Sequence, residues 1–229
     1  MPKDNEVLVN IHAASLNAYD WHLLTADIFL SRMATGLLKP KGTMLGADIA
    51  GKVEAVGKDI KQFKVGDEVY GDLASCGGGG FSEYVTVLES ALVLKPSNLS
   101  FEEAAAIPMA AVTALQGLRD EGKIQSGQKV LINGASGGVG TFAVQLAKYF
   151  EAEVTAVCST RNQELARTLG ADHVIDYTKE NFTENGKEYD LILAANGYHP
   201  LSAYKRVLSP NGIYVMAGGT MKQITLTIL

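Results

Sequence analysis

The chain has 229 residues, of which 47% are hydrophobic and 20% charged, and its formal net charge at pH 7 is −5. These are ordinary values for a soluble globular protein, and the length suffices for one large domain or two modest ones. The negative charge gives no support to a nucleic-acid or anionic-membrane partner. The two cysteines, Cys76 and Cys158, cannot form a disulfide framework, so a reducing compartment is expected.

The N-terminal residues, Met1 to Glu6, are polar and lack the apolar run of a signal peptide. The longest apolar stretches are strand-sized or broken by glycine, well short of the roughly 20 residues that a membrane helix needs. We therefore expect a cytoplasmic protein without a membrane partner.

The first part of the chain, to about Pro96, is predicted to be all-β. Apolar and polar residues alternate from Val7 to Ile11, as in a strand with two distinct faces. Further strands are predicted at residues 49–56, 68–70, 81–87 and 91–94. Short strands joined by Gly-Asp turns predict a small barrel. The segment 18–38 is predicted to be partly helical, with an apolar face formed by Trp21, Leu24, Ile28 and Leu37.

From about Ser97 the pattern changes to alternating strands and helices. Ser100 and Glu103 form a capping-box pattern that opens a helix, and Pro108 separates it from a further helix at 110–120. Strands are predicted at 130–133, 153–157, 173–176, 190–194 and 213–216, with helices at 138–150, 163–169 and 200–208. Such crossovers imply a parallel, doubly wound sheet. The fold class is therefore all-β at 1–97 followed by α/β at 98–229.

A glycine-rich turn, Ala135-Ser-Gly-Gly-Val-Gly140, lies between a predicted strand and a predicted helix. Such a turn points backbone N–H groups and the positive end of a helix at a pyrophosphate. In this interpretation Gly137 allows close approach of the pyrophosphate, and Gly140 lets the helix pack on the sheet. Its first position is alanine, and the alternative is a tight turn in a sheet of this kind that binds something else or nothing.

The end of the next strand bears on cofactor choice. NAD enzymes commonly carry an acidic residue there for the ribose hydroxyls, whereas this strand ends in Cys158-Ser-Thr-Arg161. Ser159 and Thr160 offer two hydroxyls, and the planar guanidinium of Arg161 can bind a phosphate in bidentate fashion. The combination favours NADPH. The alternative is that Arg161 is simply a solvated residue at a helix start.

A series of short motifs occurs in one order across nearly the whole chain. They are residues 14–17, 20–21, 45–51, 53–57, 65–69, 80–84, 103–108, 113–114, 134–140 and 169–172. On these motifs the chain resembles a zinc-independent member of the medium-chain dehydrogenase/reductase superfamily, in the quinone oxidoreductase-like branch. The resemblance implies a GroES-like barrel domain, which is the catalytic domain, followed by a Rossmann domain, with NADPH in the cleft between them.

The resemblance also implies roles for particular residues. Ser136, Gly138 and Val139 would contact the pyrophosphate. The other residues of the same turn, Ala135, Gly137 and Gly140, would also belong to the cofactor site. Ser159 and Arg161 would hold the 2′-phosphate with Thr160 beside them, and Tyr177 would lie near the same end. Thr113 and Asn17 would approach the nicotinamide side, and Asn196 completes the cofactor-binding candidates. Tyr177 has an alternative as a surface aromatic that caps a strand.

Two departures from the family pattern are informative. Zinc-dependent relatives carry metal ligands where this chain has 17–20 and 46–48, and the four histidines do not form a ligand-spaced pair. We therefore predict that no metal is bound. Family members also have more chain before Val7 and after Leu229, so a chain truncated at both ends is expected. Its uncovered sheet edge suggests a fragment or a homo-oligomer in which partner chains cover the gap.

The implied activity is transfer of a hydride from NADPH to a quinone or an α,β-unsaturated carbonyl compound, both small-molecule substrates. Without zinc, hydrogen-bond donors must stabilise the developing enolate, and Tyr19 and Asn17 are the candidates. Tyr19 could instead pack beneath the cofactor. Two other functions remain open: an NADPH-binding structural or regulatory module without turnover, and a zinc-free alcohol dehydrogenase, against which the lack of a Lewis acid argues.

Overall fold

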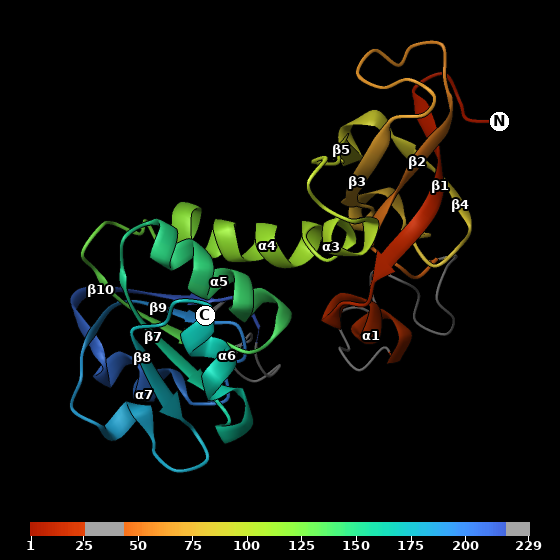
Figure 1. Ribbon diagram of the computed structural model, residues 1–229. Helices are drawn as coiled ribbons and strands as arrows, with labels where there is room; N and C mark the ends of the chain where they lie inside the picture. The colour runs from red at the N-terminus through yellow and green to blue at the C-terminus, as the bar shows by residue number, and fades with distance from the viewer. Residues whose placement is uncertain (26–43, 219–229) are drawn as a thin grey trace. The chain divides into compact units, whose positions relative to one another are not determined.

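The computed structural model describes residues 1–25 and 44–218 (Figure 1). Contacts divide the chain into two compact units, Met1–Met109 and Ala110–Leu229. The first unit includes the helix that follows Pro96, because this helix packs against the sheet of that unit. Each unit is described by itself.

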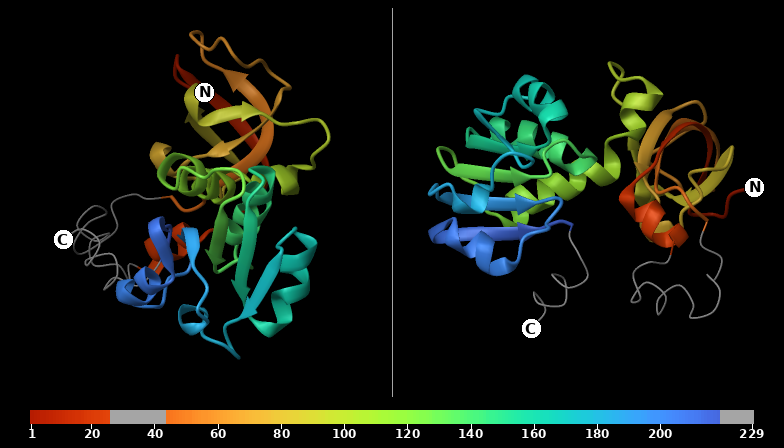
Figure 2. Two further views of the ribbon diagram at one scale, coloured as in Figure 1. Left: turned by 90° about the vertical axis from the view of Figure 1, so that its left-hand side faces the viewer. Right: turned by 90° about the horizontal axis from the view of Figure 1, so that it is seen from below.

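The first unit is built on a five-stranded antiparallel sheet in the order β4-β1-β2-β3-β5, which is strongly curved (Figure 2). The strands are β1 (Glu6–Ser15), β2 (Asp48–Val56), β3 (Glu68–Asp72), β4 (Tyr84–Leu88) and β5 (Leu92–Leu94), with 3₁₀ turns at Ala74–Cys76 and Glu89–Ala91. The period-2 pattern decides which side is buried, since Val7 and Val9 lie opposite Val87 and Val85 in one core cluster.

Helices α1 and α3 lie within the described residues of the first unit. Helix α3 (Phe101–Ala105) begins with the predicted capping box: Ser100 Oγ accepts from the Glu103 amide, and the Glu103 carboxylate accepts from the Ser100 amide at 2.8 Å. Helix α1 (Ala18–Thr25) confirms a helix at the predicted place. Of the predicted apolar face, Trp21 and Leu24 have exposed fractions of 58% and 64%. Ile28 and Leu37 lie outside the described residues.

The second unit is built on a five-stranded parallel sheet in the order β10-β9-β6-β7-β8. Its strands are β6 (Lys129–Asn133), β7 (Glu153–Cys158), β8 (His173–Asp176), β9 (Tyr189–Ala194) and β10 (Leu208–Met216). Helices α5 (Gly138–Tyr149), α6 (Gln163–Thr168) and α7 (Leu201–Arg206) and the 3₁₀ turns Thr160–Asn162 and Phe182–Glu184 connect them. The strand order reverses at β6, which marks the carboxyl edge of β6 and β9 as the crevice where such sheets bind ligands.

Alternate residues of the parallel strands enter two separate cores. Val130, Ile132 and the residues beside them pack with Ala143 and Val144 of α5, whereas Leu131 packs with Tyr204 of α7. Helices therefore cover both faces of the sheet, and the predicted doubly wound arrangement is confirmed.

Helix α4 (Pro108–Leu115) differs in detail from the prediction. It begins at Pro108, a position where the missing N–H and fixed φ suit a first helical turn. From Gln116 to Glu121 the chain continues as a π-helical turn, so the predicted helix at 110–120 changes character after Leu115. Within the described ranges, no helix is long and apolar enough to cross a membrane.

Candidate functional site

The glycine turn is fixed to the neighbouring strand by its own backbone. The amides of Gly134 and Ala135 both donate to the carbonyl of Val157, at 3.2 and 3.1 Å, and the Gly137 amide donates to Gly134 O at 3.1 Å. Gly134 has φ +88°, which favours glycine. The carboxyl ends of β6 and β7 are thereby held together at the start of α5.

The glycines of this turn serve different purposes. A Cβ on Gly140 would lie 2.7 Å from Ala135 Cα and would also collide with the carbonyl of Gly134. Helix α5 can therefore pack this closely against the turn only if residue 140 is glycine. A Cβ on Gly137 would meet only Gly134 O at 3.6 Å, an ordinary contact, and its φ of −83° suits any residue. The fold itself therefore does not require glycine at Gly137, and its bare backbone leaves an exposed surface open for a ligand.

The N-terminus of α5 lies directly behind this open surface. Gly137 is its N-cap residue, and no side chain caps the first turn. The first amides of an uncapped helix carry the positive end of the helix dipole, which suits a phosphate or another anion. Ser136 is half-buried beside them.

Asn162 connects the glycine turn to the end of β7. Its side-chain amide donates to Ser136 Oγ at 3.0 Å and lies 3.3 Å from Ser159 Oγ. Arg161 stands next to it with an exposed side chain that forms no ion pair with any described residue. Two predicted site residues, Ser136 and Ser159, are thus brought together. Sequence reasoning missed Asn162, whose only signal was its place directly after Arg161.

Thr160 has a different set of partners. Its hydroxyl donates to Asp176 Oδ2 at 2.5 Å, and Asp176 also accepts from Thr178 and Gln163. The hydrogen bonds from Thr160 and Thr178 hold the pKa of Asp176 well below its usual range. Asp176 ends β8 opposite Cys158, so an acidic residue lies on the strand next to this loop. The sequence interpretation considered only the end of β7 and missed it.

The other cofactor candidates of the second unit lie near the same edge. The Tyr177 amide donates to Cys158 O at 3.2 Å, and its ring is 59% exposed. Asn196 follows β9, and its carbonyl accepts from Asn133 Nδ2 at 3.1 Å. Thr113 is half-buried one helical turn after Ala110, whose Cβ lies near the start of α5.

A buried carboxylate network occupies the first unit. Asp48 is completely buried and accepts from Ser15 Oγ at 3.2 Å, Asn17 Nδ2 at 3.0 Å and the Met109 amide at 3.1 Å. Burial raises the pKa of Asp48 to about 6, against the opposing effect of these donors. Asn17 Nδ2 also donates to Ser15 Oγ, so both its amide hydrogens are used inside the network. Of the Asn17 side chain, the Oδ1 atom is then left for another partner.

Tyr19 lies beside this network at the start of α1. Its side chain is 37% exposed and has no hydrogen-bond partner among the described residues. Burial raises the pKa of Tyr19, and the charges of Asp72 and Asp20 raise it further, so the hydroxyl stays protonated at neutral pH. Asp20 is buried and accepts from the amides of Asn17 and Gly46, which fixes the beginning of the helix.

No three His, Cys, Asp or Glu side chains gather into a possible metal site in the ranges 1–25 and 44–218. The histidines described there are in other settings: His173, for example, pairs with Glu153 at 2.9 Å. Metal independence stays a prediction.

Comparison with known proteins agrees with this arrangement. Residues 3–97 match the family described as alcohol dehydrogenase GroES-like domain, and residues 138–229 match the family described as zinc-binding dehydrogenase. The chain is 41% identical over 226 residues to a chloroplast envelope quinone oxidoreductase homolog of Arabidopsis thaliana, covering 92% of this chain and 65% of the relative. It is 38% identical over 208 residues to the NADPH-dependent alkenal/one oxidoreductase, chloroplastic, of the same plant, covering 85% and 51%.

A solved structure gives the same result in three dimensions. The quinone oxidoreductase from Coxiella burnetii superposes with a TM-score of 0.83 at 30% identity, covering 93% of this chain and 67% of that one. The matches define the class by its fold: a GroES-like antiparallel domain followed by a Rossmann-type parallel sheet. The chain belongs to the medium-chain dehydrogenase/reductase superfamily, in its quinone oxidoreductase-like branch. It spans about half to two thirds of the length of these curated relatives.

Proposed function

We propose that the protein is an NADPH-dependent reductase of quinones or α,β-unsaturated carbonyl compounds. The observation that carries the proposal is the open backbone at Gly137, joined through Ser136 and Asn162 to the loop that carries Ser159 and Arg161. The names of the relatives, a quinone oxidoreductase homolog and an NADPH-dependent alkenal/one oxidoreductase, agree with this substrate class.

The residues take the following roles in this proposal. The amides at the start of α5 and Ser136 bind the pyrophosphate, while Ser159 and Arg161 bind the 2′-phosphate. Thr160 holds the loop through Asp176. Tyr177, Thr113 and Asn196 complete the cofactor site. A bound nicotinamide would supply the hydride.

In the first unit, Tyr19 is the proposed proton donor to the reduced substrate. Its raised pKa keeps the proton on the hydroxyl at neutral pH. Asn17 is a positioning residue, since its amide hydrogens bind Asp48 and Ser15. The cytoplasmic location and self-association remain predictions, and the Arabidopsis relatives are described as proteins of the chloroplast.

Arg161→Ala tests the choice of cofactor. Loss of a charge-assisted hydrogen bond costs about 1.5–3 kcal/mol, so the Kd for NADPH should rise roughly 10- to 100-fold while that for NADH is unchanged. Fluorescence titration with both dinucleotides measures this. Arg206→Ala, which removes an exposed arginine at the end of α7, is the matched control. Tighter binding of NADH by the unmodified protein, or a neutral effect of Arg161→Ala, would contradict the preference for NADPH.

Tyr19→Phe tests the proton donor. A positioned general acid contributes typically about 10²- to 10⁴-fold, so kcat should fall by a factor in this range while the affinity for NADPH is kept. NADPH oxidation followed by absorbance, with a quinone and with an enone, provides the rate. Tyr84→Phe, at a tyrosine that is 50% exposed on β4, is the control. Binding without oxidation of NADPH would instead favour a cofactor-binding module without turnover.

A further inference from the structure

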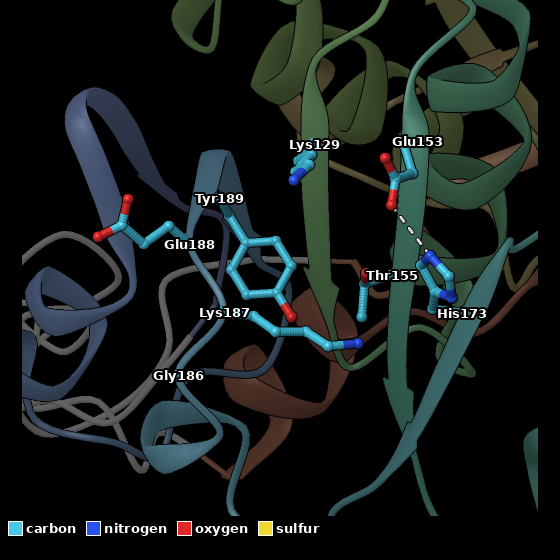
Figure 3. Close-up of a pocket in the computed structure, with 8 residues that line it drawn as sticks. All are labelled: Lys129, Glu153, Thr155, His173, Gly186, Lys187, Glu188 and Tyr189. Atoms are coloured by element: carbon cyan, nitrogen blue, oxygen red, sulfur yellow. Dashed lines mark hydrogen bonds and ion pairs between the residues drawn. The ribbon is translucent and has the colours of Figure 1, made fainter.

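A hollow lies in the Rossmann-type unit, at the opposite edge of the sheet from the glycine turn. It has a volume of about 430 Å³ and is lined at the amino ends of the strands by Lys129 of β6, Glu153 and Thr155 of β7, and His173 of β8 (Figure 3). Lys187 in the loop before β9 and Tyr189, the first residue of β9, complete its lining. Dinucleotides bind at the carboxyl edge of such sheets, so this hollow is separate from the proposed cofactor site.

The hydroxyl of Tyr189 is an unusual feature of this hollow. The side chain is 2% exposed, and its buried oxygen makes no hydrogen bond of good geometry in the described part of the chain, although the side chains of Thr155 and Asn185 lie close enough to lower its pKa. The ring reaches into the hollow, with the hydroxyl directed toward Thr155 and the end of Lys187 (Figure 3). Buried hydroxyls nearly always have a partner, so a missing one points to a group that the protein chain does not supply. Burial raises the pKa of Tyr189, which leaves its hydroxyl a donor at neutral pH.

Two lysines and two glutamates line the hollow, and the charges of Glu180 and Glu153 add to the raised pKa of the Tyr189 hydroxyl. Lys129 and Lys187 form no ion pair with any described residue. The carboxylate of Glu153 is paired with His173 Nε2 at 2.9 Å, and Glu188 points away from the Tyr189 ring (Figure 3). Two ammonium groups and two hydroxyls therefore present donors, which are complementary to an oxyanion.

We propose that this hollow, which we call the Tyr189 pocket, binds a small molecule through a carboxylate or a phosphate group. The anion accepts hydrogen bonds from Tyr189 and Thr155 and is balanced by Lys187 and Lys129. The volume lies within the range of about 300–1,000 Å³ that small-molecule sites occupy. The proposal does not depend on the proposed reductase activity, because none of its residues belongs to the cofactor site.

Titration with inorganic phosphate and, separately, with benzoate tests the proposal, with amide chemical shifts of the ¹⁵N-labelled protein as the readout. Either probe should give saturable shifts at Thr155 and Tyr189 and in the loop at Lys187. Phosphate can also bind at the glycine turn. Amide chemical-shift changes near Ser136 would report that separate binding event. A response to phosphate alone assigns the pocket to phosphorylated ligands, and a response to benzoate assigns it to carboxylates.

Three variants make the assignment specific. Lys187→Gln should weaken binding about tenfold, and Tyr189→Phe should weaken it several-fold with little change in the thermal midpoint, since the hydroxyl makes no hydrogen bond of good geometry with the described residues. Lys52→Gln, an exposed lysine on β2, should change nothing. The proposal is overturned if neither probe shifts the pocket residues, or if binding there survives both Lys187→Gln and Tyr189→Phe. In the first case a water molecule satisfies Tyr189.

Discussion

Gly137→Ser should weaken NADPH binding at least tenfold and raise the free energy of unfolding by at most about a few tenths of a kcal/mol, whereas Gly140→Ala should lower that free energy by about 1–3 kcal/mol. Serine is a better N-cap than glycine, and a Cβ at Gly137 meets only Gly134 O at 3.6 Å. The same side chain would cover the exposed backbone of the turn and offer its own oxygen to the first amides of α5, in competition with a phosphate.

The added methyl group at Gly140 acts differently because it lies inside the fold. The methyl group would stand 2.7 Å from Ala135 Cα. Because two hydrogen bonds to Val157 O hold the backbone of this turn, the backbone cannot move aside as a flexible side chain could. Urea unfolding and NADPH titration on both variants separate the two effects. Wild-type NADPH affinity in Gly137→Ser would show that the pyrophosphate does not lie on this turn. Wild-type stability in Gly140→Ala would contradict the close approach of α5.

The sequence predicted the parts of the fold that depend on local periodicity. In the second unit Val130 and Ile132 enter one core and Leu131 the other, and this alternation is visible in the sequence. The capping box at Ser100 was equally local. The apolar residues after Ala18 show the limit of such patterns, because their spacing predicts an apolar helix face, yet Trp21 is 58% exposed. Periodicity states which residues could share a face, and tertiary contacts decide whether that face is covered.

The candidate sites depend on contacts that no local pattern contains. In the sequence, Asp48 belongs to a family motif and to a departure from a metal-ligand pattern, while its partners Ser15 and Met109 lie 33 and 61 residues away. The hydrogen bond from Thr160 to Asp176 joins the turn after β7 to the end of β8, and the two residues are 16 positions apart. The glycine turn could be predicted because its residues are consecutive. Networks between distant residues could not, since each member alone is an ordinary polar residue.

Asp48→Ala should lower the free energy of unfolding by about 2–4 kcal/mol, because Ser15, Asn17 and the Met109 amide would lose a buried acceptor together. Asp59→Ala, at an exposed position of the same unit, should have little effect. Urea unfolding at pH 7 measures both. Equal stabilities would mean that water replaces the carboxylate and that the network does not hold the start of α4.

Asp48→Asn isolates the charge of the same group through the pH dependence. The pKa of Asp48 is raised from 3.8 to about 6 on folding, so between these values the folded protein binds a proton that the unfolded chain does not. Its contribution to stability is therefore fully present below about pH 4 and is lost as pH rises through 6. A shift of about two pKa units sets an upper bound of about 3 kcal/mol on the change.

The stability difference between the wild-type protein and Asp48→Asn should thus move in favour of the wild type as pH falls from 7.5 to 4. Asp176 acts with the opposite sign, because its pKa is lowered and its contribution is lost on acidification. Asp176 is present in both proteins, so its contribution cancels in the difference between them. Unfolding must therefore be measured across the pH range for both the wild-type protein and Asp48→Asn. A difference that moves toward the variant on acidification would mean that the donors from Asn17 and Met109 outweigh burial. Asp48 would then be a charged cap of helix α4 at all physiological pH values.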